Sequence, residues 1–411
     1  MDSHLVSYPI SRPHTINRTG LVWAMGIAQI LAWSTTYYLP AVLSSPIARD
    51  MGWSITSTVA GLSWGLLVAG ACSPMVGRQI DRHGGRPVLA TSSMLMALGL
   101  LLMGVASNLV IYYLAWTFIG VAMAAGLYDA AFSTLGRLFG ESARTSMTGL
   151  TLLGGFASTL GWPLIAGLEQ QIGWRYSCVT LAATHLVIGL PIHLLVIPKS
   201  ERISNSGTKP IRDPSTTTAH HTKSYNRLFL LLATLLTLQS LVVSSISVHL
   251  LDVLKLLGIA TATALAIGMM IGPSQVAARL AEFSLGRNLH PTTSAKAAIL
   301  LSGIGIGLLI PAIPSLAFVA MALYGAGNGI LTIARGTLPL ALFGQDGYGA
   351  RMGLLARPML VAQALGPVAA AVILDKFGST PLLIVMCTLA TASLIASFGL
   401  PNASGHHALR N

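Results

Sequence analysis

The feature that most constrains this chain is a series of long apolar runs separated by short polar loops. A helix that crosses the hydrocarbon core of a bilayer needs about 20 apolar residues. We count twelve such runs, at approximately residues 21–46, 54–76, 88–106, 110–136, 145–168, 176–197, 228–251, 257–279, 295–313, 315–341, 352–374 and 379–400. Runs this long and continuous predict helices, because barrel strands are shorter and alternate apolar with polar residues. The sequence therefore predicts an all-α membrane protein whose twelve transmembrane helices lie in a lipid bilayer.

The composition excludes a water-soluble chain. Only 9% of the 411 residues are charged and 53% are hydrophobic, whereas soluble globular proteins carry about 25% charged residues. A chain with so few charges cannot cover a large folded surface with polar groups, which excludes a soluble multidomain enzyme. The same apolar content excludes a disordered chain.

The basic residues are distributed unevenly between the loops. The chain has 24 Lys and Arg against 12 Asp and Glu, a formal charge of +12. With the N-terminus inside, 18 basic residues fall on the inner side, among them Arg78 and Arg279, and four fall on the outer side. Positive charge collects on the cytoplasmic side of membrane proteins. We therefore expect both termini in the cytoplasm, and the basic excess indicates orientation rather than binding to nucleic acid.

One hydrophilic segment divides the chain into two groups of six spans. We expect an N-terminal bundle of residues 1–200, a flexible cytoplasmic linker of residues 201–226 and a C-terminal bundle of residues 227–411. A shift of 201 positions places the run from Gly77 to Asp81 over the run from Ala278 to Glu282, between the second and third spans of each half. This match predicts two six-helix bundles with pseudo-two-fold symmetry, which enclose a central cavity.

The most specific motif is GRQIDRHGGRP, from Gly77 to Pro87. It resembles the loop motif G-x-x-x-D-R-x-G-R-R/K of the major facilitator superfamily, which lies between the second and third spans. The resemblance covers essentially the whole chain, and it implies a transporter that works by alternating access of two bundles. It also implies a conformational latch formed by Gly77, Asp81, Arg82 and Arg86. The alternative is that Arg82 and Arg86 only set the orientation in the membrane.

Two further segments bear on the substrate. The run from Trp33 through Tyr38 and Pro40, followed by Gly52-Trp53-Ser54, resembles bacterial members of the monocarboxylate and oxalate–formate antiporter branch. That resemblance implies a small organic anion as substrate, proton symport or anion exchange, and a bacterial inner membrane. Proton-driven efflux of a drug or metabolite is the alternative. Against it, Trp116 stands where drug–proton antiporters carry an arginine, and Gly161-Trp162-Pro163 interrupts their motif in the fifth span.

Three charged residues fall inside predicted spans, where a charge costs at least about 2.5–3.5 kcal/mol and needs a cavity and a partner. Alignment of Gly120 with Gly325 places Asp129 and Arg335 at similar depth on opposite walls of the cavity. We expect Arg335 and Arg357 to bind a substrate carboxylate and Asp129 to couple transport to protons. The alternatives are a structural Asp129–Arg335 pair, and an Arg357 side chain that reaches the inner surface.

Neutral polar and aromatic residues on the cavity-lining spans are further candidates for substrate contact, although such side chains also serve as hydrogen bonds between helices. They are Gln29, Trp33, Tyr37, Tyr128, Gln239 and Asn328. The sequence shows no catalytic cluster, metal-ligand spacing or nucleotide-binding loop. We therefore expect a gradient-driven monomeric transporter with no enzyme activity, no metal and no cofactor. A membrane sensor is disfavoured, because the expected tails of about twenty and ten residues leave no room for a signalling domain.

Overall fold

The computed structural model describes residues 17–199, 218–286 and 289–402, which form helices and no strand. The N-terminal bundle contains α1 (Arg18–Thr35), α2 (Pro40–Met51), α3 (Ile55–His83), α4 (Gly85–Gly104), α5 (Leu109–Gly126), α6 (Tyr128–Phe139), η1 (Gly140–Ser142), α7 (Ala143–Gly154), α8 (Ala157–Thr184), η2 (His185–Gly189) and η3 (Ile192–Val196). The C-terminal bundle contains α9 (Thr218–Leu256), α10 (Thr261–Met269), α11 (Ile271–Ser284), α12 (Pro291–Gly307), α13 (Pro314–Phe343), α14 (Tyr348–Phe377) and α15 (Ser379–Phe398). Most of the predicted linker lies outside the described residues.

The helices reproduce the twelve predicted spans. Eight described stretches are long and apolar enough to cross a membrane, and one of them, Leu109–Val196, contains three predicted spans. Within this stretch the backbone turns at Gly173. Its φ is 73°, a positive value that glycine adopts readily because it has no Cβ. The two predicted spans that are still missing from this count are the first and the ninth. The first corresponds to α1 together with α2, and the ninth corresponds to α12, which is 17 residues long. The fold is therefore the expected all-α arrangement of twelve transmembrane helices.

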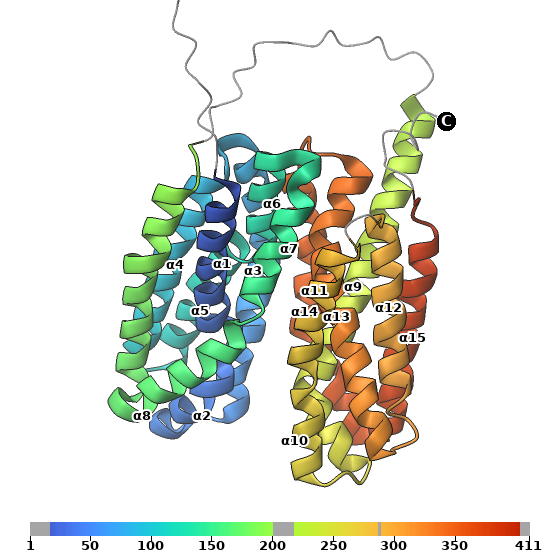
Figure 1. Ribbon diagram of the computed structural model, residues 1–411. Coiled ribbons are helices and arrows are strands. Elements are labelled where there is room, and N and C mark those ends of the chain that lie inside the picture. Colours follow the sequence, from blue (N-terminus) through green and yellow to red (C-terminus); the bar gives the residue numbers. More distant parts are fainter. Residues whose placement is uncertain (1–16, 200–217, 287–288, 403–411) are drawn as a thin grey trace, which may run out of the picture.

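The two bundles lie side by side, and α1 begins on the same side of the molecule as that on which α15 ends (Figure 1). We call this side, where α1 begins and α15 ends, the terminal end, and the opposite side the open end. A continuous cluster of buried apolar side chains fills the N-terminal bundle and extends onto α14 through Tyr348, Met352 and Leu360. The core of the N-terminal bundle therefore continues across the junction between the bundles.

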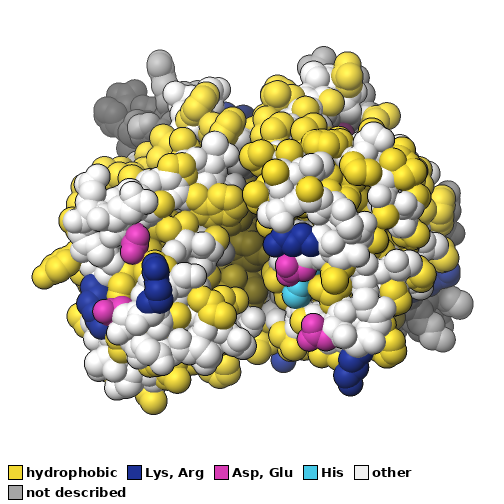
Figure 2. Space-filling model, turned by 90° about the horizontal axis from the view of Figure 1, so that it is seen from below, with side chains coloured by type: hydrophobic (Ala, Val, Ile, Leu, Met, Phe, Trp, Pro, Cys, Tyr) yellow, Lys and Arg dark blue, Asp and Glu magenta, His cyan; other side chains and the backbone are white. Residues whose placement is uncertain are grey.

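Contacts between the bundles are closest at the terminal end. There α3 packs against α14 so tightly that a Cβ on Gly77 would lie 2.0 Å from the carbonyl oxygen of Gly349. The two backbones can approach this closely only because both facing residues are glycines, which have no side chain. Seen from the open end, the molecule is hollowed between two lobes, and apolar side chains line the depth (Figure 2). The bundles thus meet at one end and enclose a hollow that opens at the other.

Candidate functional site

The predicted charges of spans four and ten meet across the junction between the bundles. Arg335 on α13 donates through Nη2 to Oδ2 of Asp129 on α6, and both side chains are 17% exposed. Asp129 Oδ1 and Arg335 Nε are buried and have no partner among the described residues. The pair is therefore incompletely hydrogen-bonded, and each member has capacity for another ligand. The alignment of the two halves correctly placed these charges opposite each other.

A break in the fourth span positions Asp129. Helix α5 ends at Gly126, Leu127 adopts an extended conformation, and α6 begins at Tyr128. Asp129 thus lies in the first turn of a new helix, where the partial positive charge of the helix N-terminus stabilises a carboxylate. Discontinuous helices of this kind place helix ends at the binding sites of transporters.

Gln29 on α1 stabilises this break. Its Nε2 donates to the carbonyl of Gly126 at 2.6 Å, and its Oε1 accepts from Trp33 Nε1 at 3.1 Å. The Gly126 carbonyl lies at the end of α5, and Gln29 supplies its donor. Gln29 is 1% exposed and does not line the hollow. Gln29 was predicted to contact substrate. In this conformation its side chain instead positions Trp33 and the break between α5 and α6.

We expect Gln29→Leu to lower the thermal stability of the protein. The change leaves the Gly126 carbonyl and the Trp33 indole N–H without partners, and each buried orphan costs about 1–3 kcal/mol. Unfolding is followed with a thiol-reactive dye, because Cys178 is completely buried in the folded protein. Gln363→Leu is the matched control, since Gln363 lines the hollow. Equal midpoints for the two variants would contradict the assigned role.

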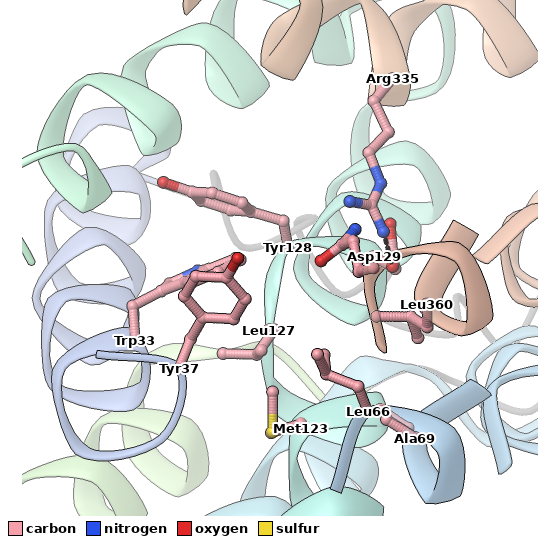
Figure 3. Close-up of a pocket in the computed structure, with 12 residues that line it drawn as sticks. Trp33, Tyr37, Leu66, Ala69, Met123, Leu127, Tyr128, Asp129, Arg335 and Leu360 are labelled. Carbon is pink, nitrogen blue, oxygen red and sulfur yellow. Dashed lines mark hydrogen bonds and ion pairs between the residues drawn. The ribbon is translucent and has the colours of Figure 1, made fainter. Parts of the chain in front are cut away.

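An aromatic wall faces the charged pair. Trp33 lies in α1 and Tyr37 follows the end of that helix. Both lie opposite Arg335 and Asp129, and Tyr128 lies beside them (Figure 3). The ring centroids of Trp33 and Tyr128 are 5.0 Å apart, and those of Trp33 and Tyr37 are 5.4 Å apart. With apolar residues of α3, α5 and α14 they line a narrow space that is partly open to solvent. The site therefore combines one ion pair with a largely apolar and aromatic surface.

Arg279 on α11, which the sequence analysis placed among the inner-surface charges, lies beside the site and is not one of the residues that line the hollow. The structure buries it to 4% exposure between the bundles. Its Nη1 donates to the carbonyl of Thr151 at 2.8 Å, and its Nε and Nη2 lie 3.4 Å from the Gly329 carbonyl and from Gln275 Oε1. None of the described carboxylates pairs with it. Arg279 is therefore a buried cation with neutral acceptors only.

A second helix end holds this cation. Helix α7 ends at Gly154, and Arg279 reaches the carbonyl-rich, partly negative end of that helix. A Cβ on Gly154 would lie 2.4 Å from the Tyr128 hydroxyl, and one on Gly155 would lie 2.4 Å from Arg279 Nη1. Consecutive glycines thus bring Tyr128 and Arg279 to the same helix end, so the guanidinium adjoins the aromatic wall.

The remaining predicted substrate residues lie apart from the hollow. Gln239 on α9 is 1% exposed, and neither amide atom has a partner among the described residues. Asn328 on α13 is partly exposed and is not among the lining residues. Arg357 is exposed on α14 and is likewise absent from the lining. The structure therefore brings together Trp33, Tyr37, Tyr128, Asp129 and Arg335, and not these three.

Gly77 and Asp81 of the loop motif hold α3 to α14. The two carboxylate oxygens of Asp81 accept from the backbone N–H groups of Gly349 and Ala350, at 2.8 and 2.7 Å. Asp81 thus caps the N-terminus of a helix in the other bundle. Arg82 and Arg86 form no ion pair with the described residues, whereas Arg137, which the motif does not include, donates to the Asp81 carbonyl.

The C-terminal bundle makes a matching contact. Arg144 Nη2 on α7 donates to Glu282 Oε1 on α11 at 2.6 Å, and Ser294 donates to the same oxygen at 2.8 Å. Glu282 is the residue that the 201-position shift aligns with Asp81. The repeat therefore identified Glu282 as the counterpart of Asp81. The sequence alone did not show that Glu282 binds Arg144.

No group of three or more His, Cys, Asp or Glu side chains suited to a metal ion occurs within residues 17–199, 218–286 and 289–402.

Twelve helices in two bundles, with charged helix ends facing a hollow between them, define a multi-pass membrane transporter. A model of the Major Facilitator Superfamily matches residues 25–295. The chain belongs to that superfamily, and it is a transporter rather than an enzyme.

Similar proteins share parts of the sequence or the whole fold. An "uncharacterized 38 kDa protein in 23S RNA operon" of Thermoproteus tenax is 30% identical over 169 residues, 41% of this chain and 44% of that protein. Mouse monocarboxylate transporter 11 is 31% identical over 168 residues, 41% of this chain and 35% of that protein. The chain thus spans less than half the length of these relatives. The crystal structure of the human organic anion transporter MFSD10 (TETRAN) superposes with a TM-score of 0.71 at 16% identity, and covers 94% of this chain and 100% of that one.

Proposed function

We propose that this transporter moves a small organic anion, a carboxylate, and that Arg279 is its central anion ligand. The observation that carries the proposal is a guanidinium at 4% exposure with no carboxylate partner among the described residues. A buried charge that has only neutral acceptors is costly. A substrate carboxylate would neutralise Arg279 through two parallel hydrogen bonds, which the planar guanidinium favours.

The surroundings of the site suit an anion with an apolar body. Trp33, Tyr37 and Tyr128 offer aromatic faces, and Arg335 offers a second guanidinium whose Nε has no partner. A carboxylate that approaches Arg335 competes directly with Asp129 for it. The name of a partial relative, a monocarboxylate transporter, and that of a structural neighbour, an organic anion transporter, agree with this substrate class.

The same pair provides a means of coupling to protons. When Asp129 is ionised, its ion pair with Arg335 ties α6 to α13 across the junction. Protonation of Asp129 removes the attraction and frees Arg335 for the substrate. Proton symport follows if a proton and the anion enter together, and anion exchange follows if one anion replaces another.

The contacts between the bundles indicate which state of an alternating-access cycle this is. The positive charges of the loops favour a cytoplasmic terminal end and both termini in the cytoplasm. The hollow then opens to the outside, and the contacts of Asp81 and Arg144 close the cytoplasmic side. Residues 1–200 would rock against residues 227–411 to reverse this arrangement, in a bacterial inner membrane.

The function is tested by flux. Purified protein in liposomes is offered labelled mono- and dicarboxylates with apolar or aromatic bodies, with and without a pH gradient. We expect saturable uptake of at least one monocarboxylate, and no uptake of the corresponding amide. Uptake of neutral or cationic compounds without any carboxylate flux would overturn the anion proposal and favour drug efflux.

We expect Asp129→Asn to separate flux from the proton gradient. The amide cannot ionise, so the variant should exchange one anion for another at a rate near wild type but lose accumulation driven by a pH gradient. The measurement compares both modes in the same liposomes. Glu169→Gln, at a carboxylate outside the hollow, serves as control. Gradient-driven uptake by Asp129→Asn equal to wild type would leave the ion pair a purely structural role.

A further inference from the structure

Arg357 is an arginine on the outer surface of the transmembrane region. It lies nine residues into α14, about 14 Å from the start of that helix. On the same helical face are Leu354, Leu365 and Val368, which are 47%, 54% and 60% exposed. A stripe of exposed apolar side chains on a transmembrane helix faces lipid. Arg357 therefore presents a charge to the hydrocarbon region, where a charge needs a partner.

No described acidic residue forms an ion pair with Arg357. The residues of α14 that line the hollow are Leu360 and Gln363, and Arg357 is not among them. Its surroundings are instead set by α3, because a Cβ on Gly70 would lie 3.2 Å from the Arg357 carbonyl. The partner of this charge must therefore come from outside the described chain, at the seam of α3 and α14.

Helix α3 carries a second exposed arginine at this seam. Ala71, Met75 and Arg78 are exposed and recur at helical spacing, whereas Leu66 and Ala69 line the hollow. The contact of Gly77 with Gly349 sets the antiparallel register. This register places Arg78 about two and a half turns, or about 13 Å, nearer the terminal end than Arg357.

The two side chains incline toward each other. Side chains on a helix lean toward its N-terminus. Helix α14 begins at the terminal end and α3 begins at the open end, so Arg357 leans toward the terminal end and Arg78 leans away from it. Met75 and Leu354 flank them with exposed apolar surface. The outer face of the seam thus offers two guanidinium groups beside the exposed apolar side chains of Met75 and Leu354.

We propose that this surface of the seam binds an anionic phospholipid, whose phosphate lies between Arg78 and Arg357 and whose acyl chains follow Met75 and Leu354. Basic pockets between transmembrane helices bind anionic headgroups in this way. Because the two arginines belong to different bundles, the site is complete only while α3 and α14 are in contact. Anionic lipid should therefore favour the state that is closed at the terminal end.

Native mass spectrometry of the full-length protein in neutral detergent tests this site. Phosphatidylglycerol and phosphatidylcholine with identical acyl chains are added separately. We expect wild type to retain phosphatidylglycerol preferentially, and Arg357→Gln and Arg78→Gln each to weaken its retention about fivefold. Arg357→Lys keeps the charge and should retain most binding. Arg49→Gln, at an exposed arginine outside the seam, should bind as wild type.

Three results would overturn the proposal. The first is equal retention of the two lipids by wild type. The second is retention of phosphatidylglycerol by Arg357→Gln at the wild-type level. The third is full displacement of the lipid by glycerol phosphate, which would make the ligand a free phosphate. Thermal unfolding of each variant confirms that it is folded, and the Arg357→Lys comparison separates loss of charge from loss of packing.

Discussion

Replacement of Arg279 by glutamine should abolish carboxylate uptake while the protein remains folded. Glutamine retains hydrogen-bond donors that can reach the Thr151 carbonyl, so the contact between α11 and α7 is partly preserved. The positive charge is lost, and with it the attraction for the anion. Loss of one member of a buried, hydrogen-bonded charge pair costs at least about 30-fold in affinity. Uptake in liposomes should fall by at least that factor at substrate concentrations below saturation.

A neighbouring arginine provides the comparison for this experiment. Arg144 also lies at the junction between α7 and α11, but its Nη2 donates to the carboxylate of Glu282, whereas Arg279 has only neutral acceptors among the described residues. Arg144→Gln should change the rate of uptake and leave the apparent affinity for the anion close to wild type. Arg279→Lys should retain part of the affinity, since a lysine keeps the charge but not the planar fork. Unchanged affinity in Arg279→Gln would remove Arg279 from the binding site.

The second large effect is expected at Gly77. In Gly77→Ala the new Cβ would lie 2.0 Å from the Gly349 carbonyl oxygen, and neither backbone can move without displacing its helix. Overpacking of this kind costs about 1–3 kcal/mol. We therefore expect the equilibrium to shift about 5- to 150-fold toward the state that is open at the terminal end. Spin labels at the exposed positions His83 and Asp346 should report a longer distance.

Gly167→Ala is the matched control for this measurement. Gly167 lies in α8, and a Cβ there would meet nothing within 4 Å. The two variants therefore introduce the same group into helices, with and without a facing backbone. Labelling requires a chain without Cys72, Cys178 and Cys387. Identical distance distributions for Gly77→Ala and Gly167→Ala would show that the α3–α14 contact does not determine the closed state.

The fold was predictable because each membrane span is determined by a long stretch of consecutive residues. A span is defined by about 20 successive residues, so errors of a few residues at the boundaries do not change the count. The position of Asp129 opposite Arg335 was also predictable, because two glycines fixed the alignment of the halves. The engagement of Asp81 followed from the motif, although Arg82 and Arg86, which match the motif equally well, form no ion pair within the described part of the chain.

The surroundings of Arg279 and Arg357 could not be read from the sequence, for two different reasons. The predicted eighth span ended at residue 279, whereas α11 continues to Ser284 and carries Arg279 inside the bundle junction. Arg357 lies inside its span as expected, but sequence alone does not specify which face of α14 turns toward the hollow. The roles of Gln29 and Arg137 depend on partners about 97 and 56 positions away, and only the tertiary structure brings these together.

The two contacts that close the terminal end differ in chemistry. Asp81 binds backbone N–H groups at a helix end, whereas Glu282 binds the guanidinium of Arg144, whose side chain is 20% exposed. Salt screens the attraction between two full charges at a partly exposed site, while hydrogen bonds from neutral backbone N–H groups to one carboxylate are screened less. Rising ionic strength should therefore loosen the α7–α11 side of the gate before the α3–α14 side. Opening of the terminal end would then begin as an asymmetric hinge, with the contact between Gly77 and Gly349 as its axis.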